Sequence, residues 1–138
     1  MTTPSSTGPV STRDFIVSRL SETYLVAAEA YLKSGNPTTG LDRLNEVRKR
    51  AGVANATLAE FNIDYILDER GRELLGEYHR WFDLKRTGTL VARASAHHYK
   101  IKASNFAGVG GALKILRPIP QQALDLNQNK DFPQNPGY

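Results

Sequence analysis

Residues 19–52 read RLSETYLVAAEAYLKSGNPTTGLDRLNEVRKRAG, a pattern that predicts two consecutive helices. In the first, expected over residues 19–33, apolar side chains recur at spacings of three and four, as they do on one helix face. Gly35 is placed to end that helix, and Asn36-Pro37 provides an N-cap residue and a first-turn proline for the next. The second helix is expected to run to about Arg50, and a turn this short requires antiparallel packing. The expected apolar stripe of the first helix is Leu20, Tyr24, Ala27, Ala28, Tyr31 and Leu32.

Several positions of this stretch lie close to the spacing of one tetratricopeptide repeat, a helix-turn-helix unit of about 34 residues. Small residues at Ala28 and Gly40 would let the two helices approach closely, although the repeat normally carries alanine where this chain has Gly40. One such repeat cannot bury its own faces, so the pair is expected to pack on further helices. The matching positions are Tyr24, Ala27, Ala28, Tyr31, Gly35, Gly40, Leu44, Val47 and Gly52.

A third helical region is expected after Thr57, whose spacing to Glu60 is that of a capping box. We predict a longer helix there, from Asn62 or Ile63 to about Tyr78, which continues with a bend through Lys85. Shorter helices are expected at residues 90–96 and 121–126, separated by a glycine-rich loop in which residues 114–116 favour a short strand. The predicted fold is therefore all-α: a tetratricopeptide-like helical hairpin packed on a further long helix, with an irregular C-terminal third.

Composition excludes several classes of protein. The chain has 138 residues, enough for one domain with a buried core, and it lacks cysteine, which excludes disulfides and thiolate chemistry. A formal charge of +4, with acids and bases mostly interleaved, weighs against nucleic-acid binding. No apolar run approaches the roughly 20 residues that span a bilayer. Residues 1–12 are predicted to be a disordered linker or lead-in, and residues 13–138 a helical domain.

The stretch ERGRELLGEYHRWFDLKRTG, residues 69–88, concentrates acids and arginines around a histidine and the only tryptophan. Paired carboxylates there would suit a glycoside hydrolase, but such an enzyme needs them on opposite sides of a cleft. Glu69 and Glu73 lie one turn apart on the same predicted helix face, beside arginines that keep them ionised. No catalytic residue is therefore predicted. The alternating charges instead favour a structural ion-pair network of Glu69, Arg70, Glu73, Glu77, Arg80 and Asp83, with Arg70 directed at the core.

Ligand-binding candidates lie in the loop after residue 96. They are His98, Tyr99, Asn105 and Phe106, which combine aromatic faces with hydrogen-bonding groups; the alternative is a loop that is solvated or contacts a partner. Trp81 and Phe82 would also suit a sugar ring, although their helical spacing favours core positions. The histidines lack metal-ligand spacing, and no phosphate-binding or nucleotide motif occurs, so neither a metal nor a cofactor is predicted.

Five segments together resemble the C-terminal region of SusD/RagB proteins, in that family's order and over residues 13–138. They read RLSETYLVAAEAYLKSGN, LDRLNEVRKRAGV, ILDERGRELLGEYHRWFDLKRTG, LRPIPQQALDLNQN and QNPGY. The resemblance implies a helical, non-catalytic lipoprotein of Bacteroidetes on the extracellular face of the outer membrane. Such proteins bind glycans or other oligomeric nutrients and cap a SusC-type, TonB-dependent transporter.

The chain departs from that family at its beginning, where the resemblance would imply a signal peptide, a lipidated cysteine and a long preceding region. We therefore expect a C-terminal fragment whose only membrane contact would be the lipid anchor of a parent protein. Self-association through apolar faces is expected of such a fragment. The alternative function is a tetratricopeptide-like interaction module that contacts the transporter and has no ligand of its own.

Overall fold

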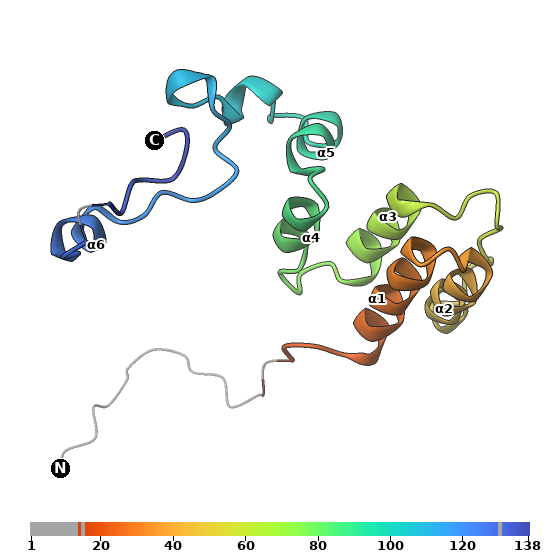
Figure 1. The fold of residues 1–138 in the computed structure, drawn as a ribbon. Helices are drawn as coiled ribbons and strands as arrows, with labels where there is room; N and C mark the ends of the chain where they lie inside the picture. Colours follow the sequence, from red (N-terminus) through yellow and green to blue (C-terminus); the bar gives the residue numbers. More distant parts are fainter. Residues whose placement is uncertain (1–13, 15, 130) are drawn as a thin grey trace, which may run out of the picture. The chain divides into compact units, whose positions relative to one another are not determined.

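The computed structural model describes residues 14, 16–129 and 131–138. The chain divides into two units, the first ending at Glu77 and the second beginning at Tyr78. The expected linker at residues 1–12 lies outside the described residues, and a single domain over residues 13–138 stays a prediction. Within the described ranges there are helices, turns and one isolated β-bridge but no strand, which confirms the all-α fold (Figure 1). The helices are α1 (Leu20–Lys33), α2 (Pro37–Arg50), α3 (Ile63–Glu73), α4 (Arg80–Arg86), α5 (Leu90–His97) and α6 (Gln121–Leu126), with 3₁₀ turns η1 (Ala103–Phe106) and η2 (Val109–Gly111).

The first two helices form the hairpin that local sequence signals predict. α1 and α2 pack against each other, and α3 lies against α1 (Figure 1). Gly35 has a φ of +81°, the left-handed backbone that ends a helix, and Pro37 occupies the first turn of α2. The Asn36 side chain accepts a hydrogen bond from the Thr39 backbone N–H at 3.4 Å. The predicted helix ends are confirmed, while the tetratricopeptide-like character of the pair stays a prediction.

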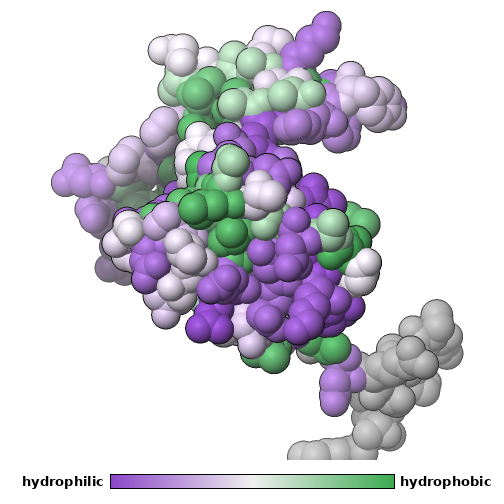
Figure 2. Space-filling model, turned by 90° about the vertical axis from the view of Figure 1, so that its right-hand side faces the viewer, coloured by the Kyte–Doolittle hydropathy of each residue, from purple (hydrophilic) through white to green (hydrophobic). Residues whose placement is uncertain are grey.

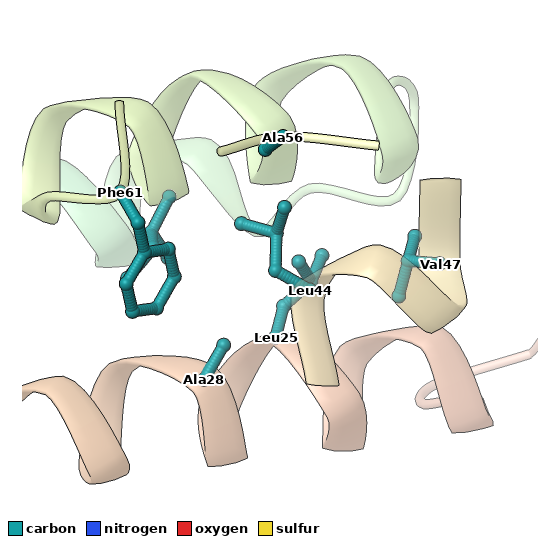
Figure 3. Close-up of a cluster of buried hydrophobic side chains, with 7 residues drawn as sticks. Leu25, Ala28, Leu44, Val47, Ala56 and Phe61 are labelled. Atoms are coloured by element: carbon teal, nitrogen blue, oxygen red, sulfur yellow. The ribbon is translucent and has the colours of Figure 1, made fainter. Parts of the chain in front are cut away.

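The core of this unit lies where α1, α2 and α3 meet (Figure 3). Leu25 is fully buried there, although it is absent from the expected apolar stripe of α1. Leu20 and Tyr31, which the stripe included, are 68% and 37% exposed. The buried face is therefore rotated from the predicted one, because packing against α2 and α3 decides which side of α1 is covered. The buried cluster is Leu25, Ala28, Leu44, Val47, Ala56, Phe61 and Ile66.

Gly40 allows α1, α2 and the segment before α3 to approach closely. A Cβ atom at this position would lie 2.8 Å from the backbone oxygen of Ala28 and 2.9 Å from Cζ of Phe61. Contacts this short are essentially never made by a real Cβ, so even alanine would force a displacement. The predicted close approach at Ala28 and Gly40 is confirmed, and it explains why glycine replaces the repeat's usual alanine.

The third helix is shorter than predicted. α3 ends at Glu73, and a new helix, α4, begins only at Arg80. Between them Gly76 has a φ of +82° and Tyr78 a φ of +64°, left-handed conformations that a continuous helix cannot contain. The expected long helix to Tyr78 and onward through Lys85 is therefore wrong.

The start of this region also differs from the prediction. Thr57 donates to the Glu60 carboxylate from its hydroxyl at 2.7 Å and from its backbone N–H at 2.9 Å, but the two residues belong to a turn. These hydrogen bonds lower the pKa of Glu60, and the bond from the hydroxyl has the larger effect. The true N-cap of α3 is Asn62, whose side chain accepts from the Tyr65 N–H at 2.9 Å. The Thr57 pair is thus a turn motif and not a helix cap.

The second unit contains the short helices and the loops. α5 and α6 occur where helices are expected, but no strand forms at residues 114–116. Instead Ala107 and Leu113 form an isolated antiparallel bridge, and the Val109 N–H donates to the Gly137 carbonyl at 3.2 Å. The end of the chain is thereby tied to the glycine-rich loop. In the described part of the chain, no helix has the length and apolar character needed to cross a membrane.

Replacing Gly40 with alanine tests the close packing of the hairpin. Glycine to alanine inside a helix ordinarily raises the free energy of unfolding by about 0.5–1 kcal/mol. We expect Gly40→Ala to lower it by about 1–3 kcal/mol, because the methyl group meets backbone and ring atoms. Thermal and urea unfolding would measure the change. Thr38→Ala, an exposed position on the same helix, is the control, and a stabilised Gly40→Ala protein would contradict this packing.

Candidate functional site

Two arginines hold the buried carboxylate of Glu69. Its Oε2 accepts from Nη1 of Arg48, on α2, at 2.7 Å and from Nη2 of Arg72, on α3, at 2.6 Å. The two guanidinium groups also lie near the Tyr65 ring, 5.6 and 6.0 Å from its centroid. Glu69 is 5% exposed, so this pairing offsets the cost of removing its charge from water.

Glu73, one turn further along α3, is also held by two arginines, both of them from outside its own helix. Its carboxylate accepts from Arg19, the residue before α1, at 2.6 Å and from Arg50, the last residue of α2, at 2.7 Å. Arg19 also pairs with Glu77 at 2.8 Å. Hydrogen bonds to Glu77 and Glu73 raise the pKa of Arg19. Burial raises the pKa of Glu73, but hydrogen bonds from Arg19 and Ser21 outweigh it and leave that pKa below its ordinary value.

Arg70 points into the core, as predicted from the sequence. It is 4% exposed, and its Nη2 lies 3.8 Å from Glu22 Oε1 of α1. The six residues of the predicted network do not share one helix, because α3 ends at Glu73. Arg80 and Asp83 lie on α4 instead, where the buried Asp83 pairs with Arg86 at 3.0 Å. The network as a whole stays a prediction.

A pocket of about 520 Å³ lies beside these carboxylates. Both Glu69 and Glu73 line it, but arginine hydrogen bonds occupy their oxygens. A glycosidase acid needs a raised pKa, whereas the pKa of Glu73 is lowered. Glu73 is therefore unsuited to donate the proton that glycoside hydrolysis requires. Its lining comprises Arg48, Ala51, Val53, Tyr65, Glu69, Arg72 and Glu73.

The predicted ligand-binding loop has an aromatic pair at its start. The rings of His98 and Tyr99 stack with centroids 5.4 Å apart, and Lys100 Nζ lies 5.2 Å from the Tyr99 centroid. Tyr99 is 86% exposed, so this surface is open to a ligand. Asn105 is engaged within η1, where its Oδ1 accepts from the Lys102 N–H at 2.7 Å. Phe106, also in η1, is half-buried.

A second pocket, of about 480 Å³, lies where core residues were expected. Phe82 is 68% exposed there, so assigning it to the core is wrong. Lys85 and Arg117 were not predicted as site residues. Residues 84–124 contain no aspartate or glutamate, and this feature of the sequence could have indicated that their basic side chains are candidates for binding. The lining comprises Trp81, Phe82, Lys85, Leu116, Arg117 and Asn135. Across the described ranges, no group of three histidine, aspartate or glutamate side chains is placed to hold a metal ion.

Comparing Arg70 with Arg72 tests the buried ion pairs. Arg70→Ala is expected to lower the free energy of unfolding by about 3 kcal/mol, because it empties a buried site in the core and leaves the half-buried Glu22 without this cation. Arg72→Ala removes an arginine whose side chain is 58% exposed and should cost less than about 1 kcal/mol. Chemical denaturation of both variants would measure the difference. Equal stabilities would contradict a structural role for Arg70.

The lowered pKa of Glu73 predicts a pH dependence. A carboxyl group with a depressed folded-state pKa stabilises the fold above its unfolded value of 4.5, and this contribution is lost as the pH falls through the folded value. Glu73→Gln should therefore cost about 1–3 kcal/mol at pH 7 and progressively less below pH 4.5. Urea unfolding from pH 3 to 7 would show the convergence. Glu46→Gln, at an exposed position on α2, is the control, and we expect its free energy of unfolding to differ little from that of the wild type across this pH range.

Comparison with known proteins places the chain in a family. The profile of the SusD family matches residues 2–138. The starch-binding protein SusD of Bacteroides thetaiotaomicron is 35% identical over 127 residues, 91% of this chain and 22% of that protein. SusD-like protein P25 of Formosa agariphila is 35% identical over 118 residues, 81% of this chain and 22% of that protein. The chain thus spans about a fifth of these relatives' length.

No solved structure gives a significant match to the chain. The match to the family profile covers nearly every residue, and the identities to two relatives extend over most of the same range. The chain therefore belongs to the SusD family.

Proposed function

We propose that this chain is a non-catalytic, glycan-binding part of a nutrient-uptake system at the extracellular face of the outer membrane, working with a SusC-type, TonB-dependent transporter. The observation that carries the proposal is the 35% identity to a starch-binding protein over 91% of the chain. Membership of the SusD family over residues 2–138 supports the same conclusion.

The surface of His98 and Tyr99 suits a sugar ring. An aromatic face carries partial negative charge, and the C–H groups on one side of a pyranose carry partial positive charge, so the two attract. Tyr99 is 86% exposed and its ring is held by stacking on His98 at 5.4 Å. A ring held in this way loses little conformational freedom when a ligand binds. We propose that this pair is the neutral-glycan surface.

The non-catalytic part of the proposal rests on the carboxylates. Glu69 and Glu73 are the acids that line a pocket of about 520 Å³, and arginines hold both of them as hydrogen-bonded carboxylates. A lowered pKa at Glu73 disfavours proton donation to a leaving group. These acids therefore suit a structural role better than hydrolysis.

A protein-interaction module is the second candidate, favoured by exposed apolar side chains. On the face in Figure 2, hydrophobic residues (green) form patches between hydrophilic areas (purple). Leu20, Val26 and Tyr31 of α1 are among the exposed large hydrophobic residues. Such a surface suits a protein partner such as the transporter.

Binding to a starch oligosaccharide tests the first candidate. We expect maltoheptaose to bind in isothermal titration calorimetry, and Tyr99→Ala to weaken it about tenfold or more through loss of the stacking face. Tyr99→Phe keeps the ring and should retain most of the affinity. Equal binding by wild type and Tyr99→Ala would contradict this surface. Capture of the purified transporter without any glycan binding would favour the interaction module.

A further inference from the structure

The second unit has an unusual charge distribution. From Leu84 to Leu124 the sequence contains no aspartate or glutamate. The acids on either side of that run are Asp83, which is buried and paired with Arg86 at 3.0 Å, and Asp125. Basic residues therefore occur along this run without an acid among them, although Arg86 is paired with Asp83. Its basic residues are Lys85, Arg86, Arg93, Lys100, Lys102, Lys114 and Arg117.

Two of these cations line the pocket of about 480 Å³ beside α4, which we call the Trp81 pocket. Lys85 comes from α4, and Arg117 from the segment before α6. Among the described residues, neither side chain forms an ion pair with a carboxylate. The Arg117 guanidinium instead lies over the Trp81 ring, 5.7 Å from its centroid, a cation–π contact that positions it while leaving its charge available.

The other residues of the Trp81 pocket supply apolar and amide surface. Phe82 is 68% exposed and offers an aromatic face. Asn135 contributes a side-chain amide, and its Nδ2 donates to the Arg117 carbonyl at 2.7 Å. Aromatic faces, an amide and unpaired cations together are the groups that recognise a sugar ring bearing an anionic substituent.

Hydrogen bonds hold the wall of this pocket in place. The Gln134 side chain accepts from the Ile119 N–H at 2.7 Å and donates to the Ile119 carbonyl at 2.9 Å. The Tyr138 hydroxyl donates to the Leu116 carbonyl at 3.2 Å. The last residues of the chain thus fix the backbone that carries Arg117. A wall that is ordered before binding needs less ordering when a ligand arrives.

We propose that the Trp81 pocket binds an acidic sugar, a pyranose that carries a carboxylate or a sulfate group. Arg117 and Lys85 contact the anionic group, Phe82 packs against the pyranose ring, and Asn135 hydrogen-bonds a hydroxyl. The proposal rests on the proposed function for its ligand class, a glycan. It adds a second site, separate from Tyr99, and a charge preference that a starch oligosaccharide does not satisfy.

Tryptophan fluorescence reports directly on this pocket, because Trp81 is the only tryptophan in the chain. The full chain is titrated with trigalacturonic acid, with a sulfated galactose trisaccharide, and with maltotriose as the neutral control. We expect a saturable fluorescence change with at least one acidic trisaccharide and a much weaker response to maltotriose. The carboxylate and sulfate arms identify which anionic group the pocket prefers. Added salt should lower the affinity for the acidic trisaccharide, because salt screens the attraction between the cations and the anionic group.

Charge-removing variants separate the pocket from general attraction to a basic surface. Arg117→Gln should lower the affinity for the acidic trisaccharide about tenfold, the size of one charge-assisted hydrogen bond. Lys85→Gln should lower that affinity several-fold. Lys102→Gln removes the same charge outside the pocket and should have little effect. Far-ultraviolet circular dichroism checks that each variant keeps its helices.

Two results would overturn the proposal. One is the absence of a saturable response of Trp81 to either acidic trisaccharide. The other is an equal loss of affinity in Lys102→Gln and Arg117→Gln. The Tyr99→Ala variant distinguishes this proposal from the proposed function, since it should leave the Trp81 titration unchanged. Binding of maltoheptaose without a Trp81 response to the acidic trisaccharides would support the proposed function and contradict this site. A Trp81 response to an acidic trisaccharide without binding of maltoheptaose would support this site and contradict starch binding at Tyr99.

Discussion

The charged side chains of α3 must be paired where they are buried, and the first unit is arranged around this constraint. Arg70 reaches towards α1, Glu69 accepts from α2, and Glu73 accepts from residues at the start of α1 and the end of α2. Because a buried charge is costly unless it is paired, these contacts favour one position of α3 on the hairpin. The hydrophobic cluster then fills the space that this arrangement leaves.

The second unit is held together by a different set of interactions. It has short helices, and its loops are tied by hydrogen bonds between side chains of the C-terminal residues and backbone groups of residues 116–119. The exposed rings of Tyr99 and Tyr138 and the half-buried ring of Trp81 lie next to cations. Several acids of the first unit are engaged in its own packing, whereas Lys85 and Arg117 of the second, among the described residues, form no ion pair with a carboxylate. This difference is why binding is proposed for the second unit.

Much of the fold follows from local sequence signals. The ends of α1 and α2 depend on Gly35 and Asn36-Pro37, residues whose backbone preferences act within a few positions. α6 likewise forms over the expected residues. The candidate site was predicted only partly. The exposed pair of His98 and Tyr99 lies in the expected loop, but the Trp81 pocket combines residues from three separate parts of the chain, and no local pattern marks such a combination.

The sequence by itself determined the helical class, the hairpin, the family and the presence of paired charges near α3, because these depend on residue type and short-range spacing. Tertiary structure decided which partners the charges take: Arg19, Arg48 and Arg50 are all more than one helix turn away in sequence. It also decided that α3 ends at Glu73 and that Leu25 is buried while Leu20 is exposed. These outcomes depend on which surfaces meet, and helical periodicity alone leaves that choice open.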